Sequence, residues 1–366
     1  MRLSACLIVK NEERFLAACL DSILPHVDEI VVVDTGSTDS SIEIAQARRA
    51  RVMNYAWADD FAAARNTGVD AATGDWILYI DADEQLSLPA GRSLADNLGG
   101  DGAFAGLVRF FPRLNSTPYW EYRLFRNDPR LRFKGAMHET IVPDLEALRR
   151  SIGAEVVQSP ATLIHYGYEG DLTPKFRRNL PWLRDAVARE PDRLYYWFDL
   201  ARSLAGLEET TEALAVAREG FQRATEQLDD RERAVGSALA DLLATLLVEV
   251  GEDPLPVIEA GLRLKPEQPQ LLLSKARRLI EIGRLAEAHA IVAKLCAVDA
   301  DAMIDATLAY DRSLFTRTAP HLLGITLLRL GRTAEATAAF ARAAADTPED
   351  RGYAEQVAHL QRASLG

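Results

Sequence analysis

The first 85 residues alternate between apolar runs of strand length and longer runs with helical spacing. The run at residues 29–34 is almost wholly β-branched, as strands covered on both faces are. Strands are predicted at residues 3–9, 29–34, 51–57 and 75–81, and helices at residues 12–24, 37–49 and 59–74. This order predicts an α/β fold in which a parallel sheet carries helices on both faces.

The pattern changes between about residue 102 and residue 172. Apolar runs rich in aromatic residues and arginine predict strands and their connections at residues 105–113, 119–127, 130–142 and 161–168. Proline and glycine are frequent in this stretch, so we expect no long helix there.

From Thr173 the chain is rich in leucine, alanine and arginine, and it predicts helices almost to its end. Three segments share a repeated sequence pattern (the glycine cadence), in which a glycine stands at the predicted turn between two helices. These glycines are Gly251, Gly283 and Gly331, and an alanine follows the last two after five residues, at Ala288 and Ala336. With Pro266 closing a helix, this cadence resembles the tetratricopeptide repeat, with irregular spacing and a looser first copy near Trp197. A generic helical bundle is the alternative.

Composition narrows the classes of function. The chain has 366 residues and a formal net charge of −12, which argues against the phosphate backbone of DNA or RNA as its main partner. Its three cysteines form no CxxC pair and are too few for a disulfide framework. No run approaches the roughly 20 apolar residues of a membrane span. We therefore expect a cytoplasmic protein with neither a membrane span nor a nucleic-acid partner.

Three polar clusters follow predicted strands directly, at residues 10–13, 34–39 and 81–84. Open parallel sheets bind ligands at this end of their strands, and the clusters converge if the first and fourth strands are neighbours. Asp81 and Asp83 have alternate spacing, so their carboxylates leave the chain in similar directions. Such a pair suits Mg²⁺ or Mn²⁺ held together with a diphosphate. A single acid at a strand end, such as Asp39, is more often a helix N-cap or part of a solvated loop than a ligand-binding residue.

The motifs "LIVKNEERFLAACLDSI", "IVVVDTGSTDSS" and "DDFAAARNTGVDAATGDWILYIDADEQL" occur in this order within residues 3–170. Together they resemble glycosyltransferase family 2, whose members have the Rossmann-like GT-A fold and use nucleotide-sugar donors. The helical tail resembles the subgroup that joins this domain to tetratricopeptide repeats. The resemblance implies a GT-A catalytic domain at residues 1–172 and a repeat-like α-helical domain at residues 173–366.

The resemblance also implies roles for individual residues. Nucleotide binding falls on Val9, Lys10, Asn11, Glu12, Asp34, Arg65, Asn66, Asp81 and Ala82. Asp34 is expected at the uracil or ribose, and Thr35 stands where the family more often has a second acid. Asp81 and Asp83 match the DxD motif, which implies that they hold Mn²⁺ or Mg²⁺ and the diphosphate. Glu84, one residue further along, would accept a hydrogen bond near this site without binding the cation itself.

Residues further along complete the expected site. His165 is the candidate for a further metal ligand, because GT-A enzymes often supply a late histidine and neutral imidazole ligates Mn²⁺ better than it ligates Mg²⁺. Inversion at the sugar requires a base for the acceptor. Glu139, next to His138, lies where the family places that base, although a Glu-Asp pair is more usual. Arginines on the aromatic strands could contact phosphate or lie on the surface; they are Arg109, Arg123 and Arg126.

The sequence thus predicts a metal-dependent, inverting glycosyltransferase acting from a nucleotide-sugar donor, with UDP favoured, on a peptide, protein or small-molecule acceptor. The helical repeats would hold that acceptor or a protein partner. A sugar-phosphate nucleotidyltransferase would need a glycine-rich loop where this chain has "VKNEE". A response-regulator receiver would leave the aromatic region unexplained. The non-enzymatic alternative is a repeat scaffold with a degenerate transferase domain. The presence of Asp34, Asp81 and Asp83 argues against this alternative.

Overall fold

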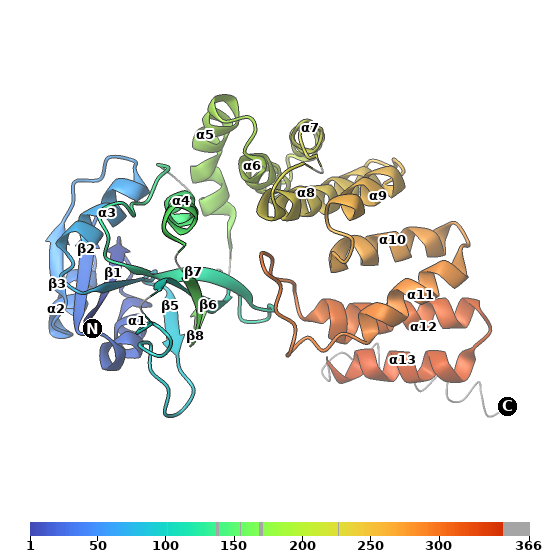
Figure 1. Ribbon diagram of the computed structural model, residues 1–366. Helices are drawn as coiled ribbons and strands as arrows, with labels where there is room; N and C mark the ends of the chain where they lie inside the picture. Colours follow the sequence, from blue (N-terminus) through green and yellow to red (C-terminus); the bar gives the residue numbers. More distant parts are fainter. Residues whose placement is uncertain (101, 137–138, 154, 168–170, 226, 347–366) are drawn as a thin grey trace. The chain divides into compact units, whose positions relative to one another are not determined.

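The computed structural model describes residues 1–100, 102–136, 139–153, 155–167, 171–225 and 227–346. The chain forms two compact units. Unit 1 comprises Met1–Glu169 with Ile304–Ala309, and unit 2 comprises Gly170–Met303 with Tyr310–Gly366. Unit 1 holds all the named strands, whereas unit 2 is helical (Figure 1).

Unit 1 is built on an eight-stranded sheet with the order β3-β2-β1-β4-β7-β6-β8-β5. The strands are β1 (Leu3–Val9), β2 (Glu29–Asp34), β3 (Arg51–Asn54), β4 (Trp76–Tyr79), β5 (Glu84–Ser87), β6 (Ala103–Phe111), β7 (Tyr119–Arg126) and β8 (Glu155–His165). Strands β1 to β4 run parallel, which confirms the parallel arrangement predicted for the first 85 residues. Because β7 pairs antiparallel with β4, the whole sheet is mixed.

Helices cover both faces of the parallel part, because successive residues of a strand point to opposite sides. These helices are α1 (Leu16–Ile23), α2 (Ser41–Ala47) and α3 (Phe61–Ala71). Leu7 of β1 belongs to the core that holds Leu16 and Leu20 of α1. Its neighbour Cys6 belongs to the opposite core, with Val69 of α3. The near-continuous apolar runs in these strands therefore serve two cores at once.

One helix in the aromatic region was not predicted. Strands β6, β7 and β8 confirm three of the runs expected there, but the fourth run, residues 130–142, ends in α4 (Val142–Ile152). Pro143 stands in the first turn of α4, where a missing N–H costs little, and Gly153 ends the helix with φ at 65°. Leu145 is buried against the sheet core. The helix has 11 residues, so it is of average length. It was not predicted because Pro143 and Gly153 were interpreted as breakers rather than as start and stop signals.

Unit 2 is a series of helices with short turns between most of them (Figure 1). They are α5 (Thr173–Arg189), α6 (Leu194–Gly206), α7 (Thr210–Phe221), α8 (Asp230–Glu249), α9 (Leu255–Leu264), α10 (Pro269–Glu281), α11 (Leu285–Cys296), α12 (Ala319–Arg329) and α13 (Thr333–Ala345). Helices α6 and α7, α8 and α9, α10 and α11, and α12 and α13 pack as pairs. In the described part of the chain, no helix has both the length and the apolar composition to cross a membrane.

The turns between paired helices have left-handed backbone, as the glycine cadence predicts. Gly251, Gly283 and Gly331 have φ of 77°, 81° and 75°, a conformation that glycine adopts without steric cost. In the first helix pair, α6 and α7, the corresponding turn residue is Glu208, with φ of 63°. A positive φ is uncommon for a residue with a Cβ, which explains why the sequence signal is weakest there.

The repeat spacing is irregular because of one long connection. Gly251 and Gly283 are 32 residues apart, whereas Gly283 and Gly331 are 48 apart. A non-helical stretch follows α11 and is succeeded by a π-helical turn, Leu314–Thr318, that leads into α12. Part of this stretch belongs to unit 1, in which Asp305 forms a parallel bridge with Tyr119.

The contact between α12 and α13 provides a test of the repeat packing. Ala336 is fully buried with Leu327 and Phe340, so we expect Ala336→Leu to overpack the contact and lower the free energy of unfolding by about 1–3 kcal/mol. Ala338 lies on the exposed side of the same helix, and Ala338→Leu is the matched control. Thermal or denaturant unfolding measures both. Equal stabilities of the two variants would contradict this packing.

Candidate active site

The loops after β1, β2 and β4 meet at one edge of the sheet, because parallel neighbours end on the same side. Val9 at the end of β1 is level with Asp34 at the end of β2. Ile80, just after β4, donates its N–H to the carbonyl of Cys6 in β1 at 3.3 Å. The convergence expected for the three polar clusters is therefore confirmed.

Hydrogen bonds tie the loop after β1 to the loop after β2. Asn11 adopts a left-handed backbone with φ of 58°, which asparagine tolerates better than most residues. Its side-chain oxygen accepts the N–H of Thr38 at 2.7 Å. The N–H of Glu12 donates to the hydroxyl of Ser41 at 2.8 Å. The two loops thus form one connected rim, although they are separated by a helix and a strand in the sequence.

Asp34 shapes the second loop from its interior. The side chain is buried, and its carboxylate accepts the N–H groups of Gly36 at 3.0 Å and Ser37 at 3.1 Å. The neighbouring Thr35 donates its hydroxyl to the carbonyl of Val9 at 3.1 Å. These bonds fold the loop back on itself, as Asp side chains do in turns. The expected contact of Asp34 with a nucleotide stays a prediction.

Two other residues of this rim have simpler roles. Asp39 accepts the N–H groups of Glu13 and Ser41, each at 3.0 Å. The N-cap residue of α2 is Ser40, which makes no side-chain capping bond, so Asp39 is not the N-cap and instead ties the two loops together from one residue earlier. Lys10 is exposed. A phosphate or ribose contact of Lys10 therefore stays a prediction.

Residues 81–84 form a tight turn. The N–H of Glu84 donates to the carbonyl of Asp81 at 3.1 Å, and the N–H of Asp81 donates back to the Glu84 carboxylate at 3.0 Å. Ala82 and Glu84 are buried. The side chains of Asp81 and Asp83 remain 35% and 23% exposed. The turn thus buries every second side chain and leaves the two aspartates accessible to a ligand.

His165 lies beside this turn because β8 pairs with β5. Its Cα stands opposite that of Glu84 in the antiparallel register, and its Nε2 atom is 3.1 Å from Oδ2 of Asp83. Gly167 follows closely, and a Cβ at that position would collide with the Asp83 carboxylate. The sequence singled out His165 but not Gly167, whose only signal is its place two residues after the histidine.

The donors at this edge fit a divalent cation that also takes ligands from a substrate. Among the described residues, no group of three or more His, Cys, Asp or Glu side chains is arranged to hold a metal by itself. Asp83 and His165 provide one carboxylate and one imidazole. Mg²⁺ and Mn²⁺ commonly keep several waters and bind one or two carboxylates plus substrate phosphates. A mixed oxygen and nitrogen set is more typical of Mn²⁺.

Arg65 of α3 connects the turn to Glu139. Its Nη2 donates to Asp81 at 2.6 Å and its Nε donates to Glu139 at 2.5 Å. The guanidinium lies over the rings of Tyr79 and Phe133, 5.4 Å and 5.6 Å from their centroids. Burial works to raise the pKa of Asp81, but the charges of Arg65 and Arg123 and the hydrogen bond from Arg65 together outweigh burial, and the pKa is lowered to about 2. Asp81 is therefore ionised at neutral pH.

Asn66, next to Arg65, holds the segment that leads toward Glu139. Its side-chain amide donates to the carbonyl of Phe133 at 2.9 Å, and its side-chain oxygen accepts the N–H of Phe133 at 2.8 Å. Both polar ends of Asn66 are thus occupied by the backbone. A nucleotide contact of Asn66 stays a prediction, and His138 lies outside the described residues.

Residues 4–152 match the family model described as glycosyl transferase family 2. Residues 4–152 are a glycosyl transferase family 2 domain. This confirms the family indicated by the three sequence motifs. The sheet described above, with its parallel strands and carboxylate turn, is the structure of this glycosyltransferase domain.

Two relatives extend beyond the glycosyltransferase domain. A TPR repeat-containing protein of Synechococcus elongatus is 40% identical over 195 residues, 50% of this chain and 48% of that protein. The SPbeta prophage-derived glycosyltransferase SunS of Bacillus subtilis is 26% identical over 259 residues, 66% of this chain and 58% of that protein. The chain thus spans about half the length of the curated relatives it matches.

Solved structures show only slight overall likeness. Glucosyl-3-phosphoglycerate synthase from Mycobacterium tuberculosis with Mn²⁺, UDP-glucose and phosphoglyceric acid gives a TM-score of 0.35 at 19% identity, covering 45% of this chain and 71% of that one. YrrB, a TPR protein with an unusual peptide-binding site, gives a TM-score of 0.37 at 14% identity, covering 50% of this chain and 84% of that one. We draw nothing from likeness at this level.

Arg123 in the glycosyltransferase domain corrects the sequence interpretation of the aromatic arginines. It is buried rather than on the surface, 5% exposed, and its two terminal nitrogens bond the Glu84 carboxylate at 2.7 Å and 3.0 Å. Its guanidinium is therefore committed within the protein, which removes it from the candidates for phosphate contact. Arg126 likewise donates to the carbonyl of Ala103 at 3.1 Å and lies over Trp76.

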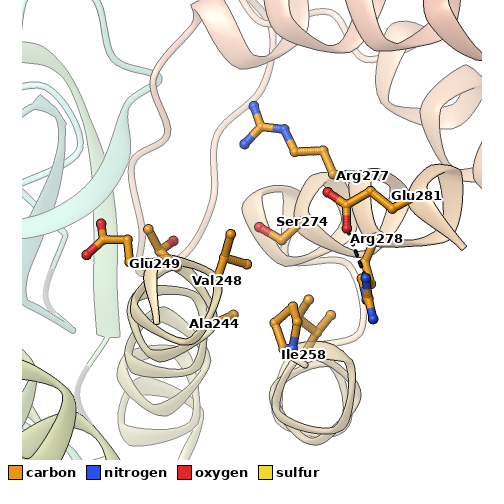
Figure 2. A pocket seen from close by; sticks show the side chains of 10 residues that line it. Ala244, Val248, Glu249, Ile258, Ser274, Arg277, Arg278 and Glu281 are labelled. Atoms are coloured by element: carbon orange, nitrogen blue, oxygen red, sulfur yellow. Dashed lines mark hydrogen bonds and ion pairs between the residues drawn. The ribbon is translucent and has the colours of Figure 1, made fainter. Parts of the chain in front are cut away.

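A pocket of about 190 Å³ lies in unit 2, between α8, α9 and α10 (Figure 2). Its wall is mostly apolar, and several of its polar groups are already paired. Ser274 donates to Asp241 at 3.0 Å, and Arg278 binds Asp253 at 2.9 Å and Glu281 at 3.1 Å. None of these contacts sets up a nucleophile or an acid–base group.

The pH dependence of stability tests the electrostatics of the rim. Burial raises the pKa of Glu12 to about 7, and the charges of Asp83 and Asp81 add to the rise. Unfolding restores the ordinary value near 4.5, so between pH 4.5 and 7 the native state binds the proton more tightly. The contribution of Glu12 to stability is therefore greatest below pH 4.5 and declines as the pH rises toward 7.

Glu12→Gln cannot ionise and should remove this decline. We expect the melting temperature of the variant, relative to that of the wild type, to increase as the pH rises from 4.5 to 7. The exposed Glu43→Gln is the control for loss of one carboxylate. Melting curves at several pH values measure all three proteins, and parallel pH profiles of wild type and Glu12→Gln would refute the assignment.

Proposed function

We propose that this chain is a metal-dependent, inverting glycosyltransferase that moves a sugar from a nucleotide-sugar donor, with UDP favoured, to a peptide or protein acceptor. The observation that carries the proposal is the turn at residues 81–84. Two accessible aspartates stand there beside the loop of Asp34 in a glycosyl transferase family 2 domain. The name of SunS, a glycosyltransferase, supports the same activity.

The donor would lie across the rim formed by the loops after β1 and β2. In this arrangement Val9, Lys10, Asn11 and Glu12 line the nucleotide, and Asp34 faces its uracil or ribose. The diphosphate would then reach the turn that holds Asp81. The hydrogen bonds that join the loop after β1 to the loop after β2 support this placement, because they make the two loops one continuous rim.

Mn²⁺ or Mg²⁺ would be held by Asp83 with His165 and by the diphosphate, with Asp81 close by. When bound, such a cation stabilises the departing diphosphate as it gains charge. Among the protein's own groups, Asp83 would supply the carboxylate and His165 the imidazole that hold the cation. The 3.1 Å separation of Nε2 and Oδ2 supports a shared role for the two side chains.

Glu139 is the proposed base for the acceptor, with the neighbouring His138 assigned to the same step. The bond from Arg65 engages Oε1 of Glu139, so the carboxylate is held in a fixed orientation. An ionised carboxylate can receive a proton from an acceptor hydroxyl or thiol while the bond to the donor sugar forms and the diphosphate leaves.

The helical repeats would hold the acceptor or a partner protein. We propose residues 1–172 as the catalytic domain and residues 173–366 as this binding domain. The TPR repeat-containing relative supports a role in protein interaction. A cytoplasmic setting accords with the three cysteines, which are free and buried. A small-molecule acceptor is the alternative outcome of an acceptor screen.

Asp83→Asn tests the metal assignment. The amide keeps the size of the side chain but loses the negative charge that a hard cation requires. We expect the variant to fold and to lose Mn²⁺-dependent binding of UDP, measured by calorimetry with and without Mn²⁺. Asp75 stands exposed before the opposite end of β4, and Asp75→Asn is the matched control. Unchanged UDP affinity in folded Asp83→Asn would remove Asp83 from the site.

Glu139→Gln tests the base. The amide cannot take up a proton at neutral pH, and general bases typically contribute about 10²–10⁴-fold to rate. We expect normal UDP-sugar binding and transfer at least about 100-fold slower, with a smaller loss for a thiol acceptor, since a thiol is partly ionised by itself. A panel of UDP-sugars identifies the donor first, through slow hydrolysis by water.

Asp144→Asn is the control for the base, because Asp144 is the next carboxylate along the chain and pairs with Lys134 at 2.6 Å. If Asp144→Asn loses transfer and Glu139→Gln does not, the base is Asp144. A wild-type protein that binds no nucleotide sugar would favour the non-catalytic scaffold.

A further inference from the structure

A buried ion pair lies directly behind the aspartate turn. Glu84 at the start of β5 is 0% exposed, and Arg123 in the middle of β7 is 5% exposed. Nη2 of Arg123 bonds Oε1 of Glu84 at 2.7 Å, and Nη1 bonds Oε2 at 3.0 Å. This two-point geometry fixes the plane of the carboxylate as well as its position.

The same carboxylate also holds the backbone of the turn. Oε2 of Glu84 accepts the N–H of Asp81 at 3.0 Å, while the N–H of Glu84 donates to the carbonyl of Asp81 at 3.1 Å. That carbonyl accepts the thiol of Cys19 at 3.3 Å as well. The backbone of Asp81 is thus held through both its N–H and its C=O, and the carboxylate of Glu84 serves three donors at once.

Arg123 has little freedom to move away from this arrangement. Its guanidinium lies over the rings of Tyr79 and Phe110, 4.6 Å and 4.7 Å from their centroids. Within the described residues, its buried Nε has no hydrogen-bond partner. The hydrogen bonds that orient the guanidinium are therefore those to Glu84, and the two rings limit its other motions.

Stability alone is a poor explanation for such a pair. Taking two charges out of water costs free energy, and apolar residues of similar size often replace a buried ion pair without loss of stability. What apolar residues cannot replace is the acceptor for the N–H of Asp81. The carboxylate can meet the two donors of Arg123 and this N–H together, which a neutral side chain with one acceptor oxygen cannot.

We propose that Glu84 is a positioning residue for the aspartate turn and that Arg123 acts through it. Glu84 fixes the backbone of Asp81, and this sets the direction in which Asp81 and Asp83 present their carboxylates to one ligand. Arg123 holds Glu84 in the required plane. The role in donor binding rests on the proposed function, whereas the effect on the turn does not.

Two double variants separate positioning from burial of charge. Glu84→Gln with Arg123→Met and Glu84→Leu with Arg123→Met both remove the ion pair and leave no unpaired buried charge. They differ at residue 84, where glutamine can still accept the N–H of Asp81 and leucine cannot. A third variant, Arg123→Lys, keeps the charge but loses the planar fork.

The direct readout is hydrogen exchange at the amide of Asp81, followed by NMR with ¹⁵N-aspartate labelling. The amide of Asp75, which donates to the carbonyl of Arg2 at 2.8 Å, is the internal reference in the same spectrum. The second readout is the affinity for UDP in the presence of Mn²⁺, and the third is the melting temperature, which shows that each variant is folded.

With glutamine at residue 84 we expect exchange within about 10-fold of wild type, and with leucine exchange at least about 100-fold faster, the range given by loss of one buried hydrogen bond. UDP affinity should follow the same order. Equal exchange in the two double variants, or wild-type UDP affinity in a folded leucine variant, would overturn the proposal.

Arg123→Lys decides the matter if the leucine variant does not fold. We expect its Asp81 amide to exchange at least about 10-fold faster than in wild type while the Asp75 amide is unchanged. Unchanged exchange at Asp81 would overturn the proposal. Should the wild type fail to bind UDP with Mn²⁺, the proposed function falls, and the exchange comparison still decides whether Glu84 positions the turn.

Discussion

The edge of the sheet at the end of β4 depends on two arginines that offset the negative charge gathered there. Arg65 bonds Asp81 and Glu139, and Arg123 bonds Glu84. Two like charges about 4 Å apart repel by roughly 4 kcal/mol at the dielectric typical of such sites. Each arginine removes that cost by standing between or behind the carboxylates, so this edge can fold before any ligand arrives. Asp83 is different, because its partner is a histidine.

The arginine pairs also mark where sequence reasoning stops. Strands β1, β2 and β4 and their polar ends could be predicted because each depends on local periodicity and on the rule that parallel strands end on one side. Arg65 and Glu139 are 74 residues apart, and Arg123 and Glu84 are 39 apart. No local pattern links them. An arginine on an aromatic strand gives the same sequence signal whether it is buried or exposed.

Helical features also divide into those that the local sequence predicts and those that it does not. The glycine turns of unit 2 could be predicted because a left-handed residue after a helix strongly favours glycine, and Gly251 and Gly283 obey that preference. Glu208 does not, so the first repeat gives a weaker signal. α4 was missed for the opposite reason: Pro143 and Gly153 stand at the two ends of the helix as start and stop signals, but residues of these two types were taken as a sign that no helix forms there.

Arg65 finally sets a condition on the proposed base. It divides its charge between Asp81 and Glu139 through two different nitrogens. Glu139 acts as the base if its charge is needed mainly in the transfer step. If instead its main work is to anchor Arg65, removing its charge would weaken donor binding rather than turnover, and the two effects are separable because binding and transfer are measured independently.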